Sequence, residues 1–205
     1  MFDNRLGLPR LMSLFAFNSF GEKEMPMTKH HRIVYTEQQV TAAIERMARK
    51  ISDFYTDEEV TLIGVLNGGV FFLSALATAL ERCGTLRACH IDFVRVSSYR
   101  AGRTSGALEL TGKLQESVRG KNAVLVDDVG DTLNTLGALR EHLLAEQPRT
   151  LQIAVLLEKP DKHVRTDVVL DYVGFAQTGL GFVYGCGMDL DGALRGLPFI
   201  AEVKE

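Results

Sequence analysis

The chain has few of the features that mark several common classes of protein. Its 205 residues include only three cysteines, at positions 83, 89 and 186, and they form no CxxC pair. An odd number of cysteines does not suit a disulfide framework and favours a reducing compartment. No apolar run approaches the ~18 residues of a membrane span. The formal net charge is −3, so no global basic field recruits nucleic acid. We therefore expect a cytoplasmic protein that binds neither membranes nor nucleic acid.

The sequence also has no internal repeat, no low-complexity segment and no histidine pair at metal-ligand spacing. The first 27 residues lack the long apolar region and the small-residue cleavage site of a signal peptide. We expect residues 1–27 to form an N-terminal extension, disordered or loosely docked, and residues 28–205 to form a single domain. The length suits one α/β domain, and a content of 46% hydrophobic residues is enough for a substantial core.

What the sequence does contain is an alternation of apolar strands and amphipathic helices. Thr36 and Glu37 make a plausible helix start, and apolar residues then recur at helical spacing as far as Ile51. The next segment predicts a strand, a tight NGG turn and a helix that ends at Gly84. Further strands are predicted over 86–99, 121–130, 150–159, 167–175 and 181–189, a helix over 135–147, and a loop or weak hairpin over 100–110. This alternation indicates an α/β fold with a parallel sheet covered on both faces.

Ligands of such sheets bind beyond the carboxyl ends of the strands. The loops that follow predicted strands lie at residues 67–69, 97–106, 127–135 and 158–160. We expect these loops to converge on one crevice.

The stretch VLVDDVGDTLNTL, residues 124–136, carries the most chemistry. The N-terminus of the helix that follows it is a natural phosphate site, and the hydroxyls of Thr132 and Thr135 can add donors. Asp127 and Asp128 repel phosphate but suit the vicinal hydroxyls of a ribose or a Mg²⁺ ion. The stretch therefore fits a ribose 5-phosphate. An acidic surface turn in which Asp131 caps the helix is the structural alternative.

Five segments in order resemble the 6-oxopurine branch of the type I phosphoribosyltransferases, the hypoxanthine-guanine phosphoribosyltransferases. The stretch above resembles the ribose-5-phosphate loop, VLNGG the pyrophosphate loop, and VSSYRAGRTSGALEL the flexible catalytic loop. LLEKP and the segment from DYVGF to GLPFI resemble the purine-binding segment and the C-terminal signature. The resemblance covers about residues 32–203. It implies the type I fold, a mainly parallel twisted sheet flanked by helices, with a small hood formed from the terminal segments.

The resemblance assigns roles within the ribose-5-phosphate and pyrophosphate loops. Asp127 and Asp128 match the acids that hold the ribose hydroxyls. Asp131 matches a catalytic acid or base near N7 of the purine. The 5′-phosphate cradle corresponds to Thr132, Leu133, Asn134 and Thr135. The pyrophosphate loop corresponds to Leu66, Asn67, Gly68 and Gly69, where the family often has a non-proline cis peptide.

Further roles fall on the remaining segments. Ser98 and Tyr99 match the flexible loop that closes over the reacting centre. Lys159 matches the lysine that donates to the purine 6-oxo group, Phe182 the aromatic side chain stacked on the base, and Val183 a backbone contact to it. Asp189, in the purine segment, matches a magnesium ligand, with Asp127 and Asp128 as further ligands directly or through water. Arg195 matches a pyrophosphate contact.

The activity implied by the resemblance is purine salvage. A phosphoribosyl group passes from 5-phosphoribosyl 1-pyrophosphate to hypoxanthine or guanine, giving IMP or GMP and pyrophosphate, with Mg²⁺ as cofactor. The family usually forms homodimers or homotetramers. Two other functions stay open: a non-catalytic nucleotide-sensing regulator on the same fold, and a sibling enzyme that prefers xanthine.

Each assignment outside the acidic stretch has a structural alternative. Lys159 could be a solvated lysine at a strand end, and Phe182 could belong to the core. Tyr99 could be an ordinary loop residue, Asp189 a cap of the segment that follows it, and Arg195 a surface residue.

The sequence departs from the family pattern at four positions. The family usually has a small residue, often glycine, where this chain has Leu133, and often a basic residue at Asn134. It usually has an aliphatic residue at Gly130, and a lysine is common at Asn67. Backbone amides can bind phosphate whatever the side chain, so a cradle survives these changes. If position 133 requires a positive φ, however, a leucine is strained there.

Overall fold

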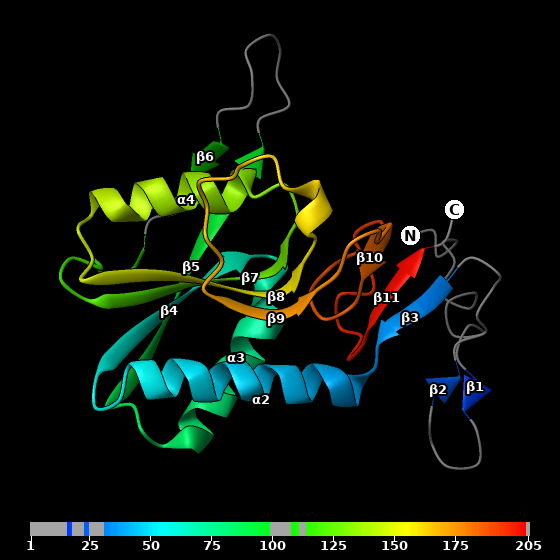
Figure 1. The fold of residues 1–205 in the computed structure, drawn as a ribbon, viewed down its shortest axis with the longest axis horizontal. Coiled ribbons are helices and arrows are strands. Elements are labelled where there is room, and N and C mark those ends of the chain that lie inside the picture. Colours follow the sequence, from blue (N-terminus) through cyan, green and yellow to red (C-terminus); the bar gives the residue numbers. More distant parts are fainter. Residues whose placement is uncertain (1–15, 18–22, 25–30, 99–107, 111–113, 204–205) are drawn as a thin grey trace, which may run out of the picture.

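The computed structural model describes residues 16–17, 23–24, 31–98, 108–110 and 114–203. Its main body is a six-stranded sheet in the order β6-β5-β4-β7-β8-β9 (Figure 1). The strands are β4 (Glu59–Leu66), β5 (Ala88–Ser98), β6 (Leu108–Leu110), β7 (Asn122–Gly130), β8 (Thr150–Glu158) and β9 (Tyr172–Ala176). The neighbouring pairs from β5 to β9 are parallel, and β6 pairs with β5 antiparallel. The predicted fold class is confirmed.

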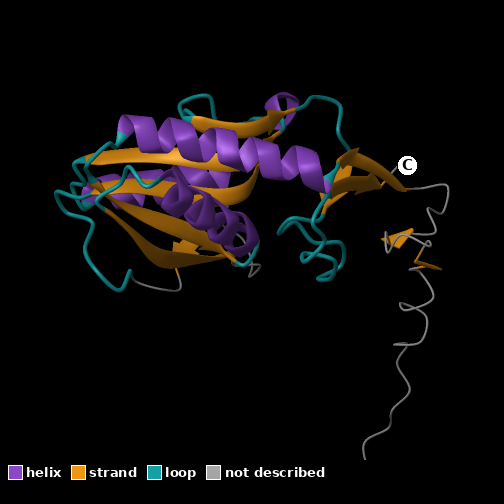
Figure 2. Cartoon of the chain, turned by 90° about the horizontal axis from the view of Figure 1, so that it is seen from below, coloured by secondary structure: helices purple, strands orange, loops and turns teal. Residues whose placement is uncertain are grey.

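Helices cover both faces of this sheet. Helices α2 (Glu37–Phe54) and α3 (Gly69–Cys83) lie on one face and α4 (Asn134–Ala145) on the other, and Figure 2 shows α2 running along the sheet. The predicted start of α2 is correct. The Thr36 hydroxyl accepts from the Gln39 backbone N–H, and the Gln39 side-chain oxygen accepts from the Thr36 backbone N–H, which together form a capping box. The predicted end of α3 is also correct, with Gly84 as a left-handed C-cap.

The core lies in two layers, because alternate side chains of each strand point to opposite faces. In β4, Leu62 packs with α2 and α3, while Ile63 and Val65 pack with α4. The buried face of α4 is apolar and is formed by Leu136, Leu139 and Leu143. Burial of such side chains contributes about 1.5–3 kcal/mol each and fixes the main sheet as a rigid support for its loops.

A second, three-stranded antiparallel sheet has the order β10-β11-β3. It joins β3 (His31–Tyr35), β10 (Phe182–Tyr184) and β11 (Ile200–Val203), so both terminal segments contribute to it (Figure 1). The Tyr184 hydroxyl and Nδ1 of His31 lie 3.0 Å apart across it. This small sheet corresponds to the expected hood, and it holds the segment after β10 beside the loops of the main sheet.

The structure differs from the sequence prediction near the C-terminus. The strand predicted over 167–175 begins only at Tyr172. The strand predicted over 181–189 ends at Tyr184, because the next three residues, Gly185, Cys186 and Gly187, have φ values of 94°, 51° and 109°. A left-handed run of this kind turns the chain out of the sheet and toward the main-sheet loops.

Parts of the chain lie outside the described residues. Within residues 1–27 only β1 (Ala16–Phe17) and β2 (Lys23–Glu24) are described, and they pair antiparallel. The N-terminal extension and the domain boundary at residue 28 stay predictions. Of the residues predicted for the flexible loop, Ser98 ends β5 and Tyr99 lies outside the described part. Within that part, no helix is long and apolar enough to cross a membrane.

Candidate active site

The loops at the carboxyl ends of β4, β7 and β8 meet the segment after β10 around one cleft of about 300 Å³. Most of the predicted site residues line it, although they come from four separate segments. The lining includes Gly68, Asp127, Asp128, Asp131, Lys159, Phe182, Val183, Asp189 and Arg195. The expected convergence is therefore confirmed for the loops at 67–69, 127–135 and 158–160, whereas most of the loop at 97–106 lies outside the described residues. Thr132 to Thr135 lie just beyond this lining, where α4 begins.

The acid pair lies at the base of the cleft. Asp128 is 7% exposed, and Asp127 is partly buried, with its Oδ1 accepting from the Asp128 backbone N–H at 2.9 Å. Burial and repulsion from Asp128 raise the pKa of Asp127 well above its usual range. Burial also raises the pKa of Asp128, although the nearby Arg195 opposes that shift. Two adjacent buried carboxylates therefore require donors or a cation from outside the chain.

Two glycines allow the pyrophosphate loop to contact the acid pair. The Leu66–Asn67 peptide bond of this loop is cis. A Cβ at Gly68 would lie 2.0 Å from Oδ2 of Asp128, and a Cβ at Gly187 would lie 2.2 Å from the Gly68 carbonyl oxygen. Sequence reasoning did not single out Gly187, and the GCG triplet around it was the available signal. A larger residue at Gly68 would displace the Asp128 carboxylate, and one at Gly187 would displace the backbone of this loop.

Lys159 is buried rather than solvated. Its side chain is only 6% exposed, and Nζ donates to the Gly181 carbonyl oxygen at 2.8 Å. Oδ2 of Asp131 lies 3.8 Å from Nζ. Burial lowers the pKa of Lys159, and the charge of Asp131 acts in the opposite direction. The alternative of a solvated strand-end lysine is therefore wrong, and the ammonium is available to a buried acceptor in the cleft.

Asp131 lines the same cleft beside Lys159. Its side chain is 46% exposed, and the residue at the N-cap of α4 is Leu133. The structural alternative in which Asp131 caps this helix is therefore wrong. A carboxylate beside a buried ammonium, open to the cleft, is placed to exchange a proton with a bound molecule.

Phe182 and Val183 form the apolar side of the cleft. Phe182 is 57% exposed, which contradicts the alternative that it belongs to the core. Val183 is buried, and β10 pairs it with Glu202 of β11. An exposed aromatic ring near a buried lysine suits a flat heterocycle with a polar edge.

Asp189 and Arg195 pair with each other at the cleft. Nη2 of Arg195 lies 2.6 Å from Oδ1 of Asp189, and its Nη1 donates to the Gly187 carbonyl oxygen at 2.6 Å. Oδ2 of Asp189 also accepts from the Gly192 backbone N–H, so Asp189 caps this turn as well as facing the cleft. The Arg195 side chain is 29% exposed, so this guanidinium is more than a free surface group.

The expected phosphate loop changes direction at Leu133, the N-cap residue of α4. Its φ of 63° and ψ of 7° are left-handed, and its side chain is 3% exposed. The left-handed conformation costs about 1–2 kcal/mol for a leucine. Burial of the side chain contributes about 1.5–3 kcal/mol and offsets that cost. The side chains of Thr132 and Asn134 on either side are exposed, and the Asn134 backbone N–H lies 3.4 Å from Oγ1 of Thr132.

The pyrophosphate loop contacts a cation that sequence reasoning missed. Nη2 of Arg95, near the end of β5, donates to Oδ1 of Asn67 at 3.1 Å. The signal was a lone basic residue between apolar residues of a strand that ends at the crevice. Gly69, the last residue predicted for this loop, is buried at the start of α3.

Comparison with known proteins gives one consistent family. The family model described as "Phosphoribosyl transferase domain" matches residues 31–183. The chain is 33% identical over 175 residues to the hypoxanthine phosphoribosyltransferase of Salmonella typhimurium, covering 83% of this chain and 94% of that protein. It is 30% identical over 175 residues to the hypoxanthine-guanine phosphoribosyltransferase of Dictyostelium discoideum, covering 84% and 95%.

Solved structures give the same result. A hypoxanthine-guanine phosphoribosyltransferase from Bacillus anthracis matches with a TM-score of 0.76 and 30% identity, covering 85% of this chain and 97% of that one. The hypoxanthine phosphoribosyl transferase of Trypanosoma cruzi matches with a TM-score of 0.77 and 30% identity, covering 84% and 91%.

Proposed function

The chain belongs to the phosphoribosyltransferase family, and from that premise we propose that it is a purine-salvage enzyme of the hypoxanthine-guanine type. It transfers a phosphoribosyl group from 5-phosphoribosyl 1-pyrophosphate to hypoxanthine or guanine and releases pyrophosphate. The products are IMP or GMP. One observation from the structure supports this reaction above the others: a buried lysine, an open carboxylate and an acid pair share a single cleft.

We assign recognition of the base to three residues. The Lys159 ammonium donates to the 6-oxo group, Phe182 stacks on the ring, and the Val183 backbone contacts its edge. A buried ammonium stabilises a carbonyl acceptor and disfavours the amino group that adenine carries at the same position. Asp131, 3.8 Å from Lys159, exchanges the proton near N7.

The sugar, its 5′-phosphate and its pyrophosphate occupy the rest of the cleft. Asp127 and Asp128 accept hydrogen bonds from the ribose hydroxyls, which supplies the donors that this buried pair requires. The 5′-phosphate binds where α4 begins, at residues 132–135, and the pyrophosphate binds at residues 67–69 and Arg195. Positive charge develops on the ribose in the transition state, and fixed carboxylates stabilise it without reorganisation.

The acidic residues fit a magnesium ion that is shared with the substrate. In the described part of the chain, no three His, Cys, Asp or Glu side chains form a group that could hold a metal. Mg²⁺ commonly binds through one or two carboxylates together with substrate phosphates, which is the arrangement these residues permit. We propose Asp189 as a ligand, with Asp127 and Asp128 binding directly or through water. When bound, the ion neutralises charge on the departing pyrophosphate.

An assay with a panel of bases tests this function. The purified protein is incubated with 5-phosphoribosyl 1-pyrophosphate, Mg²⁺ and hypoxanthine, guanine, xanthine or adenine, and the nucleotides are separated. We expect IMP and GMP to form and AMP to be absent. Faster formation of XMP than of IMP or GMP would identify the xanthine-preferring sibling. Nucleotide binding without product from any base would contradict the proposal and favour the regulator.

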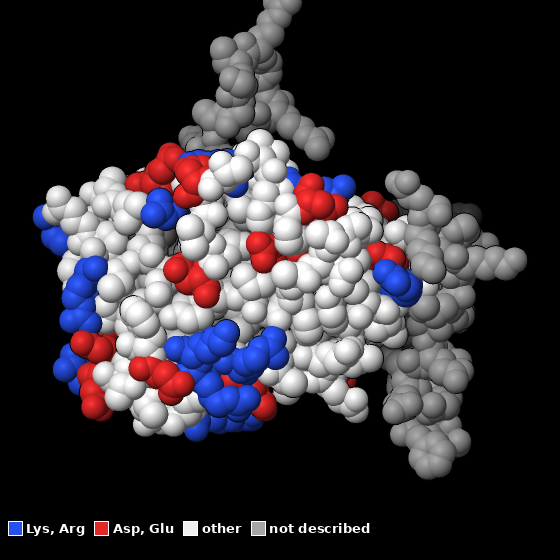
Figure 3. Space-filling view, viewed as in Figure 1, with Lys and Arg blue, Asp and Glu red and all other residues white. Residues whose placement is uncertain are grey.

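The face shown in Figure 3 gives no support to a regulator that binds nucleic acid. On the face shown in Figure 3, Lys and Arg atoms form small groups with Asp and Glu atoms beside them. Long-range attraction of a polyanion needs a continuous basic surface, because acidic neighbours cancel the field. The described residues on this face do not form one.

Assembly and location complete the proposal. We propose a homodimer or homotetramer in the cytoplasm. One of the similar structures is from a study of the C-terminal region, the oligomeric state and the enzymatic activity of the Trypanosoma cruzi protein. Sedimentation equilibrium of the full chain measures the subunit number, and a monomer at micromolar concentration would contradict the assembly.

A further inference from the structure

Gly130 and Leu133 share one volume beneath the loop that joins β7 to α4. A Cβ placed on Gly130 would lie 3.3 Å from Cδ2 of Leu133 and 3.1 Å from Cδ1 of Leu170. Both distances are shorter than ordinary van der Waals contacts. Gly130 is fully enclosed in β7, and its φ is not positive. A larger residue at position 130 would therefore have to displace the side-chain ends of Leu170 and Leu133, which line the space beside this glycine.

Leu133 is the left-handed residue of this loop, and its side chain points into the core. It belongs to the core cluster beneath α4, whereas Thr132 and Asn134 on either side are exposed. The Leu133 carbonyl oxygen accepts the first helical hydrogen bond of α4, from the Gly137 N–H at 2.9 Å. The backbone of Leu133 therefore sets the direction in which the first amides of α4 point.

Other contacts also hold the loop. The Thr132 carbonyl oxygen accepts from the backbone N–H groups of Val164 and Arg165, at 3.1 and 3.3 Å. Across the turn, the Asn134 backbone N–H makes a long contact of 3.4 Å with Oγ1 of Thr132. Leu133, at the N-cap of α4, makes no side-chain capping hydrogen bond, so its own side chain acts on the turn through its packing in the core.

We propose that Leu133 is a positioning residue for the 5′-phosphate. Its side chain, seated in the space left by Gly130, holds the left-handed turn that directs the first amides of α4 toward the phosphate. This inference rests on the proposed function, because it concerns the phosphate end of the same substrate. It also means that positions 130 and 133 are coupled: one large side chain fits between them, and the chain places it at 133.

A double-mutant cycle tests the coupling. The variants are Leu133→Gly, Gly130→Ile and the double variant Gly130→Ile/Leu133→Gly, which moves the large side chain from one position to the other. For each single variant we expect the KM for 5-phosphoribosyl 1-pyrophosphate to rise about tenfold, within the range of coupling between residues in contact. We expect the KM for hypoxanthine to stay within about threefold. The double variant should return the KM for 5-phosphoribosyl 1-pyrophosphate to within about threefold of the parent.

Leu139→Ala is the matched control, because Leu139 lies in the same core cluster but on the body of α4. It should lower Tm without raising the KM for 5-phosphoribosyl 1-pyrophosphate. Gly130→Ala is the mildest probe, since its single methyl group must displace Leu133 or Leu170. It should raise the same KM even if the larger substitutions do not fold.

Three results would overturn the inference. The first is a Leu133→Gly variant with an unchanged or lower KM for 5-phosphoribosyl 1-pyrophosphate, which is the result expected if relief of the left-handed leucine dominates. The second is a double variant whose effect equals the product of the two single effects. The third is a Leu139→Ala control that raises this KM as much as Leu133→Gly does. If the parent forms no nucleotide from any base, the proposed function fails instead, and calorimetric binding of 5-phosphoribosyl 1-pyrophosphate by the same variants still tests the coupling.

Discussion

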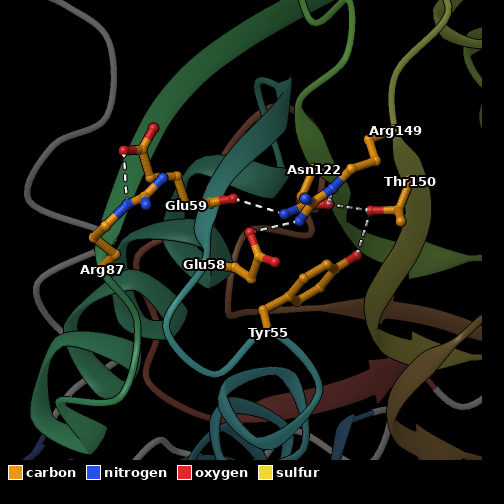
Figure 4. Close-up of polar contacts among 7 residues, drawn as sticks. All are labelled: Tyr55, Glu58, Glu59, Arg87, Asn122, Arg149 and Thr150. Atoms are coloured by element: carbon orange, nitrogen blue, oxygen red, sulfur yellow. Dashed lines mark hydrogen bonds and ion pairs between the residues drawn. The ribbon is translucent and has the colours of Figure 1, made fainter.

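The two ends of the main sheet differ in how fully their charged side chains are paired within the chain. At the amino end, Arg149 pairs with Glu58 at 2.6 Å and Arg87 with Glu59 at 3.1 Å (Figure 4). The buried Asn122 side chain donates to the Glu59 carbonyl oxygen and accepts from Nε of Arg149. It also accepts from the Thr150 hydroxyl, which in turn lies 2.9 Å from the Tyr55 hydroxyl. These charged and polar groups at the amino end therefore find their partners within the chain.

The carboxyl end leaves its charged groups incompletely matched. Asp127 and Asp128 are adjacent carboxylates with raised pKa values, and Lys159 is a buried ammonium with a lowered pKa. Leu133 is held in a left-handed conformation between them and α4. Groups that are desolvated but incompletely paired make little contribution to folding, and they gain most when a substrate supplies their partners. The comparison separates the end that stabilises the sheet from the end that binds.

The largest effect expected at the carboxyl end is on catalysis. Asp131→Asn removes the group that exchanges the N7 proton and keeps its shape. We expect kcat for IMP formation to fall about 10²–10⁴-fold, the usual contribution of general acid–base catalysis. The affinity for IMP, measured by calorimetry, should change far less. Glu58→Gln, at the amino end, is the control and should keep the parent kcat. An unchanged rate in Asp131→Asn would remove this carboxylate from the chemistry.

The next effect concerns specificity. Lys159→Met keeps an unbranched side chain and removes the ammonium. A hydrogen bond to a charged group contributes about 1.5–3 kcal/mol, so we expect kcat/KM for hypoxanthine to fall about 10- to 100-fold. The ratio of kcat/KM for hypoxanthine to that for adenine should fall as well. A variant that still excludes adenine as strictly as the parent would show that another group reads the 6-position.

At the amino end the expected effect is on stability alone. Asn122→Ala leaves the Glu59 carbonyl oxygen without this partner, at about 1–3 kcal/mol for a buried group left unpaired. Water can replace the partner of Arg149, whose side chain is half exposed. We expect Tm to fall by roughly 5–10 °C, because each kcal/mol shifts Tm by about 2–4 °C in a chain of this size. The KM values should stay at the parent level. Altered KM values in the folded variant would mean that the two ends are not independent.

The smallest expected effect is a gain in thermal stability, and it concerns Asp127 of the acid pair. The folded state raises the pKa of Asp127 above the ordinary value of 3.8. The free energy of unfolding of the substrate-free protein therefore falls as the pH rises from 3.8 toward the raised pKa. Asp127→Asn removes this penalty. We expect its Tm without substrate or Mg²⁺ to exceed the parent Tm by a few degrees at pH 7, about 2–4 °C for each kcal/mol recovered. The difference should vanish below about pH 3.8. A lower Tm at pH 7 would show that the carboxylate stabilises the empty cleft.

Much of the fold followed from periodicity and punctuation. The capping residues at Thr36, the NGG turn and Gly84 located two helices, because these signals are local. The segment 181–189 was predicted as one strand because it is apolar, yet it leaves the sheet after Tyr184. Tertiary contacts decide this, since Gly187 must approach Gly68 and Asp128 closely.

The candidate site was predictable where a role depends on the residue type. Acids, a lysine and an aromatic residue at strand ends were each visible in the sequence, and the structure brings them to one cleft. Arg95 was missed because a lone basic residue in an apolar strand does not say which group it contacts, and its contact with Asn67 arises from the pairing of β5 with β4. The burial of His163 also has no local signal: its side chain is only 20% exposed, and its Nε2 lies 3.7 Å from Oε1 of Glu158.

The sequence by itself determined the order of strands and helices and the chemical groups at the strand ends, because both depend on local pattern and side-chain type. Only the tertiary structure decided how much each group is exposed to solvent. Packing buries the Lys159 ammonium and leaves Phe182 exposed at the cleft. Burial also raises the pKa values of Asp127 and Asp128. It also explained the unusual residues of VLVDDVGDTLNTL. Leu133 and Gly130 occupy one shared volume, and a shared volume exists only once β7, α4 and the chain before β9 have packed together.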